Sequence, residues 1–373
     1  MKVDFKKGIL LLSLFLFTVS CEMNQSADFK ARDKFHVLVD TVFIDVPAFT
    51  SPNLISLFTA KIENTEHLIG YNYQNHSIDI YNLKNRVYKT TIPLKRDGPD
   101  FVSGVRALDL YSDEQFIIAD DYHLTLLDFN GQVLERFSIN IENSELKGFD
   151  FLEGRVMVNR NSGLQYDPSN QSLILEAYFF RPFDPLIHSP YLTEVNLKEK
   201  AISLIDLPDL SSRFVYENNY GELRGINFLR IGDSLILNPK FSSDVHLVTN
   251  GESSSYQLRS SYTDNLAEPL KLMNGSLSES RVQHQLKSVQ FYPMVWDPFQ
   301  ELFYRAHKSQ LDDLNQESEF FLTIADKDFR KVLEFKLPEG YYIFPIIASD
   351  GVLFSAFNKH DDKLELIRYR FSR

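Results

Sequence analysis

The sequence predicts an all-β fold, a six-bladed β-propeller with four-stranded blades in which the N-terminal strand closes the last blade. Three observations predict it: a hairpin motif that recurs along the chain, a spacing between copies that suits propeller blades, and incomplete strand sets at the two ends that complement each other. Hydrophobic residues make up 43% and charged residues 24% of the 373-residue chain. These are ordinary fractions for a globular protein, so the chain can build a core.

The hairpin motif occurs five times. In its four clear copies an apolar residue is followed four positions later by Asn or Asp, and five or six positions further on by another apolar residue. Asn and Asp initiate turns by bonding to their own backbone, and alternating apolar residues on both sides indicate half-buried strands. The clear copies are SIDIYNLKNRVYKTTIPL from Ser77, HLTLLDFNGQVLERFSI from His123, YLTEVNLKEKAISLIDLP from Tyr191 and FLTIADKDFRKVLEFKLP from Phe321. The weaker copy, DVHLVTNGESSSYQL, contains the strong two-residue turn signal Asn250-Gly251.

Two further strand-like runs precede each hairpin, so each unit is expected to have four strands. Around the second hairpin these runs are VRALDLYSD and QFIIADD, and around the fifth they are SVQFYPMVWD and ELFYRAHK. The turn positions are 46 to 76 residues apart, which fits propeller blades of about 40 to 50 residues with insertions. One helix is expected within residues 274–289, in an insertion between blades.

The two ends of the chain predict how the ring closes. Residues 343–371 supply three strands of a sixth unit and then stop, whereas residues 35–47 form a strand-like run without a partner. Pairing of residues 35–47 with residues 364–371 would complete a sixth blade and leave no bare sheet edge. A β-sandwich or two small barrels could also contain many hairpins and stays open as the alternative.

The first 21 residues have the pattern of an export signal. Lys2, Lys6 and Lys7 precede an apolar run from residue 9 to residue 19 that is too short to span a bilayer. TVSC, ending in Cys21, resembles the lipobox of bacterial lipoproteins, which implies that the Cys21 thiol carries a lipid. We therefore expect a signal peptide over 1–20, a lipidated cysteine and polar tether over 21–34, and the propeller over 35–373. The alternative is an ordinary signal peptide with a stray cysteine. Cys21 is the chain's one cysteine, so no intramolecular disulfide can form.

Together with the lipobox, two further segments carry a wider resemblance: GPDFVSGVRAL after the first blade and YPMVWDPFQELFYR in the fifth. The chain resembles the six-bladed, TolB-like β-propeller lipoproteins of Bacteroidetes, which are largely of unknown function. The resemblance implies the fold and a cell-envelope location at the outer membrane, on its periplasmic or surface face. It transfers no catalytic residues.

Charge and motifs exclude several function classes. A formal net charge of −12 argues against nucleic-acid binding and against a broad polybasic membrane contact. The sequence contains no HExxH, GxSxG, Walker or GxGxxG motif in a suitable context. We therefore expect no cofactor and no metal, and membrane attachment through the lipid alone.

One set of polar residues suggests a binding surface. In a propeller the loops between the second and third strands of every blade emerge on one face. These loops are expected to hold cations, which would favour an anionic glycan or an acidic envelope protein. The alternative is that these side chains are merely solvated. The candidate ligand-binding residues are Arg181, Lys240, Arg305, Lys308, Lys359 and His360.

The sequence thus predicts a lipid-anchored binding or scaffold protein of the cell envelope, without catalysis. The alternative is a polysaccharide lyase or glycosidase that acts on an anionic glycan at the same face. A glycosidase needs two carboxyl groups about 5 to 9.5 Å apart. The expected rim carboxylates near the cations are Asp120, Asp121 and Asp184.

Overall fold

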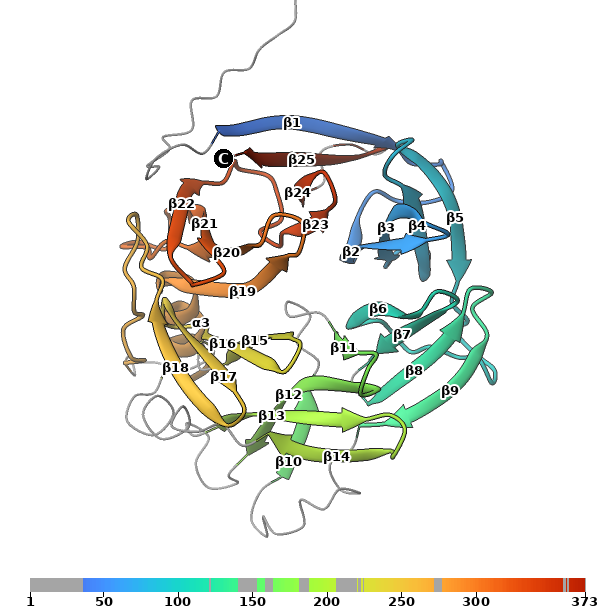
Figure 1. Ribbon diagram of the computed structural model, residues 1–373, viewed down its shortest axis with the longest axis horizontal. Helices are drawn as coiled ribbons and strands as arrows, with labels where there is room; N and C mark the ends of the chain where they lie inside the picture. Colours follow the sequence, from blue (N-terminus) through green and yellow to red (C-terminus); the bar gives the residue numbers. More distant parts are fainter. Residues whose placement is uncertain are drawn as a thin grey trace, which may run out of the picture.

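The computed structural model describes residues 36–120, 122–139, 153–157, 164–180, 188–205, 220, 223, 225–271, 277–357, 360 and 362–372. Six antiparallel sheets stand around a common axis, and each forms one blade of a propeller (Figure 1). The predicted fold is therefore confirmed. Blade 3 carries one extra short strand beside its four-stranded path.

Blades 1 and 2 follow the chain in order from the innermost to the outermost strand, and blade 3 does so with its inner edge divided between two short strands. Blade 1 contains β2 (Leu54–Ile62), β3 (Thr65–Asn72), β4 (Ser77–Asn82) and β5 (Val87–Pro93). Blade 2 contains β6 (Ala107–Ser112), β7 (Gln115–Ala119), β8 (His123–Asp128) and β9 (Val133–Ser138). Blade 3 contains β10 (Glu153–Met157), β12 (Ser172–Phe180), β13 (His188–Asn196) and β14 (Ala201–Ile205), with the extra strand β11 (Gln165–Asp167) paired to β12.

The last three blades use both ends of the chain. Blade 4 contains β15 (Ile226–Ile231), β16 (Ser234–Pro239), β17 (Asp244–Thr249) and β18 (Glu252–Gln257). Blade 5 contains β19 (Gln290–Asp297), β20 (Leu302–Lys308), β21 (Phe320–Asp326) and β22 (Lys331–Lys336). Blade 6 contains β23 (Ile346–Ala348), β24 (Gly351–Ser355), β25 (Lys363–Ser372) and, as its outer strand, β1 (His36–Asp45).

Ring closure follows the sequence prediction. β1 pairs antiparallel with β25 from His36 opposite Ser372 to Asp45 opposite Lys363. Across this pair Arg368 Nε donates to Asp40 Oδ1 at 2.9 Å and Arg368 Nη2 to Oδ2 at 2.5 Å. The hydrogen bond from Arg368 holds the pKa of Asp40 below its usual value. A two-pronged ion pair therefore joins the two ends of the described chain.

The predicted hairpins are the outer strand pairs of blades 1 to 5. In blade 5, Asp326 Oδ1 accepts the N–H groups of Asp328 at 3.0 Å and Arg330 at 2.9 Å. Phe329 in this turn has φ of 57°, which is rare for a bulky residue. Its ring packs against Phe303 at 4.9 Å between centroids, and this contact compensates for the backbone strain. A residue with left-handed backbone geometry occurs in each of these five hairpins, at Arg86, Gly131, Lys200, Gly251 and Phe329.

Apolar side chains fill the space between successive blades. Ile69 and Ile80 of blade 1 pack with Phe116 and Ile118 of blade 2 in one buried cluster. The same kind of contact joins blades 5 and 6, where the ring centroids of Phe335 and Tyr369 lie 5.1 Å apart. The blades are thus held by face-to-face hydrophobic packing, as disulfide-free propellers require.

Alternating strand direction sorts the loops onto two faces. The loops between second and third strands share one face with the connections between successive blades, and the outer hairpin turns lie on the other. The connection from blade 4 to blade 5 contains α3 (Leu277–Lys287), inside the predicted helical segment. Among the described residues, no helix has the length and apolar character needed to cross a membrane.

Candidate functional site

A cavity of about 430 Å³ lies between the innermost strands at the centre of the ring. Blades 1, 2, 3, 5 and 6 contribute to its wall through β2, β6, β11, β19 and the β23 region (Figure 1). The wall is mainly apolar, as is typical of sites for small ligands. Its apolar members include Ile55, Leu57, Phe58, Val295, Phe344 and Ile347.

The inner strands depart from regular pairing where they line this cavity. The register of β2 against β3 shifts between Ile55 and Phe58, and Ser56 within that shift has φ of 53°. The register of β19 against β20 shifts between Phe291 and Met294. β6 also shifts just after its cavity-lining residues. Such bulges re-aim side chains and are common beside functional sites, so the wall is shaped by three local distortions.

Two hydroxyl groups of the wall serve the fold. Thr59 Oγ1 donates to the carbonyl of Ile347 and links blade 1 to blade 6. Ser56 Oγ donates to the carbonyl of Arg106 at 3.4 Å and links blade 1 to the segment before blade 2. These hydroxyls are therefore engaged in holding the ring together.

Asp109 of β6 carries the one ionisable acid of the described cavity wall. Its Oδ1 accepts the backbone N–H of Leu110 at 2.8 Å, and no other hydrogen bond or ion pair reaches it from the described residues. Burial raises the pKa of Asp109 to about 7, and the Leu110 N–H opposes that rise only in part. A carboxyl group with spare hydrogen-bonding capacity thus lies in an apolar cavity.

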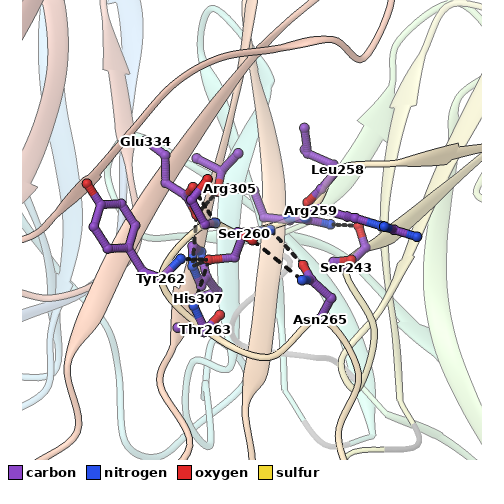
Figure 2. A network of polar contacts seen from close by, with 12 residues as sticks. Ser243, Leu258, Arg259, Ser260, Tyr262, Thr263, Asn265, Arg305, His307 and Glu334 are labelled. Carbon is purple, nitrogen blue, oxygen red and sulfur yellow. Dashed lines mark hydrogen bonds and ion pairs between the residues drawn. The ribbon is translucent and has the colours of Figure 1, made fainter. Parts of the chain in front are cut away.

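A second group of buried ionisable side chains lies between blades 4 and 5 (Figure 2). Glu334 Oε2 accepts from Lys331 Nζ and from the Ser261 backbone N–H, both at 2.8 Å. His307 Nε2 lies 3.4 Å from Glu334 Oε1. Burial by itself would raise the pKa of Glu334, but these donors and Ser260 lower it to about 2. Unlike Asp109, this carboxylate is surrounded by hydrogen-bond donors.

The Ser260, His307 and Glu334 side chains have the residue types of a hydrolase triad but not its geometry. Ser260 Oγ lies 3.0 Å from His307 Nε2, the same nitrogen that faces Glu334. In a catalytic triad the serine and the acid bond to opposite imidazole nitrogens. His307 is 0% exposed and its Nδ1 meets no partner among the described residues. The network fastens the loop after β18 onto blade 5.

A groove of about 1350 Å³ lies on the outer rim between β18 and the β21–β22 hairpin. Its floor includes Tyr256 and Phe329, whose ring centroids are 4.8 Å apart. The lining holds more cations than acids: the cations are Arg259, Lys327, Arg330 and Lys331, and the acid is Asp328. Arg330 pairs with Asp328 at 3.6 Å, and Lys331 pairs with Glu334 at 2.8 Å. Arg259 and Lys327 are therefore the lining cations that no described acid pairs with.

Comparison with known proteins places the chain in a family. A family model described as "Domain of unknown function (DUF4221)" matches residues 26–336. The chain belongs to the DUF4221 family. This confirms the predicted resemblance to propeller proteins of unknown function. No curated protein matches the chain.

Two crystal structures share the DUF4221 chain's fold. A DUF4221 member from Bacteroides vulgatus is similar with a TM-score of 0.73 at 15% identity, over 91% of this chain and 99% of that chain. A Bacteroides fragilis protein provisionally described as exported is similar with a TM-score of 0.52 at 10% identity, over 90% of this chain and 96% of that chain. At these identities both likenesses concern the fold alone.

Two of the predicted ligand-binding residues of the DUF4221 chain are buried in β20 rather than exposed in a loop. Arg305 is 1% exposed and donates to the carbonyls of Ser243 and Leu258, each at 2.8 Å. Lys308 is 6% exposed and donates to the carbonyl of Gln285 at 2.9 Å, near the C-terminal end of α3. Their predicted placement was wrong, because β20 continues through both positions and is buried along its whole length.

The other described candidates also have partners within the chain. Lys240 Nζ lies 3.7 Å from Glu176 Oε2. A Cβ on Gly225 would come within 2.4 Å of Lys240 Nζ, so this glycine makes room for the ion pair. His360 Nε2 lies 2.8 Å from Glu365 Oε2. These two side chains lie on the predicted face, and each is paired with a carboxylate of the chain.

Several predicted residues lie outside the described part of the chain. These are Cys21, Asp121, Arg181, Asp184 and Lys359. Asp120 is described and is 8% exposed, and its Oδ1 accepts the N–H groups of Tyr122 and His123, each at 2.7 Å. It therefore holds its own turn. In the described residues no group of three or more His, Cys, Asp or Glu side chains could hold a metal ion.

The candidates predicted from the sequence were placed in loops, and Asp109 is not among them. Its signal was present: an acid in the middle of the apolar strand run Ala107-Leu108-Asp109-Leu110. Asp is depleted in strands, so such a position calls for a structural partner or a ligand.

Proposed function

We propose that this DUF4221 protein is a non-catalytic binding protein of the cell envelope that takes a small, largely apolar ligand into its central cavity. The cavity at the ring centre carries the proposal. Its size lies within the range of about 300–1,000 Å³ that small-ligand sites have. The strand distortions that shape its wall, and the closed ring around it, make a preformed site.

Binding without catalysis suits the chemistry of this wall better than glycan cleavage does. Acid–base glycosidases need two carboxyl groups, and Asp109 is the one carboxyl group of the described lining. A lyase needs a base together with a group that neutralises the developing charge. The described wall offers Asp109 without a neighbouring Lys or Arg side chain.

The proposed location follows the N-terminal pattern. The basic start, the short apolar run and Cys21 fit a lipoprotein signal, so a lipid on Cys21 would hold the propeller at the membrane. The structurally similar Bacteroides fragilis protein, provisionally described as exported, is in keeping with this location. Labelling with an alkyne fatty acid tests it: the wild-type chain should be labelled and Cys21→Ser should not. Labelling of Cys21→Ser would contradict the proposed anchor.

A cavity-filling variant tests the binding proposal. Val295→Trp puts a large side chain into the wall, so we expect it to weaken binding of the neutral dye N-phenylnaphthylamine at least about tenfold. Val87→Trp, on the exposed surface of β5, is the matched control and should bind like the wild type. Equal dye affinity in the wild type, Val295→Trp and Val87→Trp would contradict binding in the cavity. Thermal unfolding confirms that each variant is folded.

A second candidate function is suggested by the basic groove on the outer rim. Arg259, Lys327 and the Tyr256 ring favour an anionic glycan, because carboxylates pair with Lys and Arg while sugar rings contact aromatic faces. This moves the predicted anionic ligand away from the loop face. The proposal concerns a surface separate from the central cavity.

Charge reversal in the groove tests this second candidate. Lys327→Glu should weaken binding to polygalacturonate, and added salt should weaken wild-type binding. Lys84→Glu is the matched control, because Lys84 is exposed in the corresponding outer hairpin of blade 1. Equal loss in both variants would indicate general charge attraction and contradict a site in the groove.

A further inference from the structure

The Asp109 carboxyl group has fewer hydrogen-bond donors than a carboxyl group in apolar surroundings needs. It accepts one hydrogen bond, from the adjacent Leu110 N–H, and its second oxygen receives no donor from the described residues. A carboxyl group that leaves water normally gains several donors or a cation in exchange. Asp109 is half-buried in the cavity wall, and the described residues give it a single donor.

The cavity around Asp109 supplies apolar contact and no positive charge. Its described lining contains no Lys, Arg or His, and β7 places the apolar Ile117 opposite Asp109 in the sheet. The polar groups that link the inner strands, Ser56 and Thr59, already donate to backbone carbonyls. A complementary charge would therefore have to enter with a ligand.

We propose that the ligand of the central cavity has an apolar body and a primary ammonium group, and that this ammonium pairs with the Asp109 carboxylate. This inference rests on the proposed function and adds the chemical class of the ligand. An ammonium group offers three donors and a full charge, which is what the free carboxylate oxygen lacks. The low polarity of the wall strengthens that pairing.

Binding of such a ligand should depend on pH. An alkylammonium group stays charged well above neutrality, whereas Asp109 ionises around pH 7 because burial raises its pKa to about 7. Amine affinity should therefore rise between about pH 5 and 8 and then level off, and binding below pH 7 should release a proton from Asp109. A neutral alcohol of the same chain length should show no such rise.

No other described group of the wall titrates in this range. Tyr342 lines the cavity, and burial raises its pKa above the ordinary value, so it stays neutral. The charged groups on the surrounding strands lie outside the lining: Lys61 of β2, Asp167 of β11 and Asp297 of β19. The expected pH response therefore belongs to Asp109.

Three probes of equal chain length test the inference: octylamine, octanol and octanoate, each measured by calorimetry and by displacement of N-phenylnaphthylamine. At pH 8 octylamine should bind about tenfold or more tightly than octanol, and octanoate most weakly. Asp109→Asn should abolish the preference for the amine and leave octanol affinity unchanged. Asp113→Asn, an exposed acid in the turn after β6, is the matched control and should keep the preference.

The outcomes separate this inference from the proposed function. Equal affinity for octylamine and octanol, or a preference for the amine that survives in Asp109→Asn, would overturn the ammonium assignment while leaving the cavity a binding site. Absence of binding of the dye and all three probes would contradict the cavity's role in binding and the ammonium assignment with it.

Discussion

Glu334 is buried and Asp109 is half-buried, and the surroundings of these two carboxyl groups differ in the hydrogen-bond donors that they supply. Glu334, between blades 4 and 5, accepts from Lys331 and the Ser261 backbone and faces His307, and its pKa falls to about 2. Asp109, at the ring centre, accepts from Leu110 alone, and burial raises its pKa to about 7. One carboxyl group is built into the fold, and the other faces an open cavity.

This contrast distinguishes a structural charge from a group available for binding. A buried charge with a full set of donors fastens neighbouring segments, and removing it leaves those donors unpaired. A half-buried carboxyl group with few donors, such as Asp109, costs the protein stability until a ligand supplies the missing donors. Strained backbone and polar groups that lack hydrogen-bond partners are concentrated at functional sites.

The largest expected effect comes from opening the ring on which both regions depend. Deleting residues 36–47 removes β1 and exposes β25, so we expect aggregation and loss of cooperative unfolding. Deleting residues 22–34, the predicted tether, should leave the melting temperature nearly unchanged. Light scattering and thermal unfolding measure both. A chain without β1 that melts like the intact protein would show that closure contributes little.

Glu334→Gln tests the structural side of the comparison. It removes the charge that Lys331 pairs with, so the free energy of unfolding should fall by about 2–3 kcal/mol. Ligand binding in the central cavity should not change. Glu339→Gln, at an exposed position in the connection that follows β22, is the control and should change stability by less than about 0.5 kcal/mol. A stable Glu334→Gln variant would remove the contrast with Asp109.

Arg305→Met tests whether Arg305 stabilises the fold rather than contacting a ligand. The guanidinium lies 4.9 Å from the Phe291 ring centroid and donates to two carbonyls, so methionine keeps bulk but leaves both carbonyls without their donor. We expect a loss of about 2 kcal/mol in unfolding free energy and unchanged binding of polygalacturonate. A selective loss of glycan binding with normal stability would instead restore Arg305 as a ligand contact.

The sequence allowed the propeller to be predicted because its signals are local. The Asx turns in the outer hairpins of blades 1, 2, 3 and 5, and the alternation beside them, depend on neighbouring residues. The strand run at residues 35–47 supplies the fourth strand that the three runs within residues 343–371 lack. The register of β1 with β25 confirms that reasoning.

The site was harder to predict because burial in a propeller depends on neighbouring blades. In β20 every residue is buried, including Arg305, His307 and Lys308, since blades cover both faces of the strand. Polar residues in such a strand therefore do not indicate a loop. Asp109 becomes distinctive only when five inner strands meet around it.

Thermal unfolding of Asp109→Asn as a function of pH tests the central claim most directly. The folded-state pKa of about 7 exceeds the ordinary value of 3.8, so between these values the folded wild type binds more protons than the unfolded chain and loses stability as pH rises. At pH 8, without ligand, Asp109→Asn should be more stable than the wild type by about 1–3 kcal/mol, and the advantage should shrink toward pH 4. A loss of stability at pH 8, of the size expected for Glu334→Gln, would show that Asp109 is a structural charge and contradict the account.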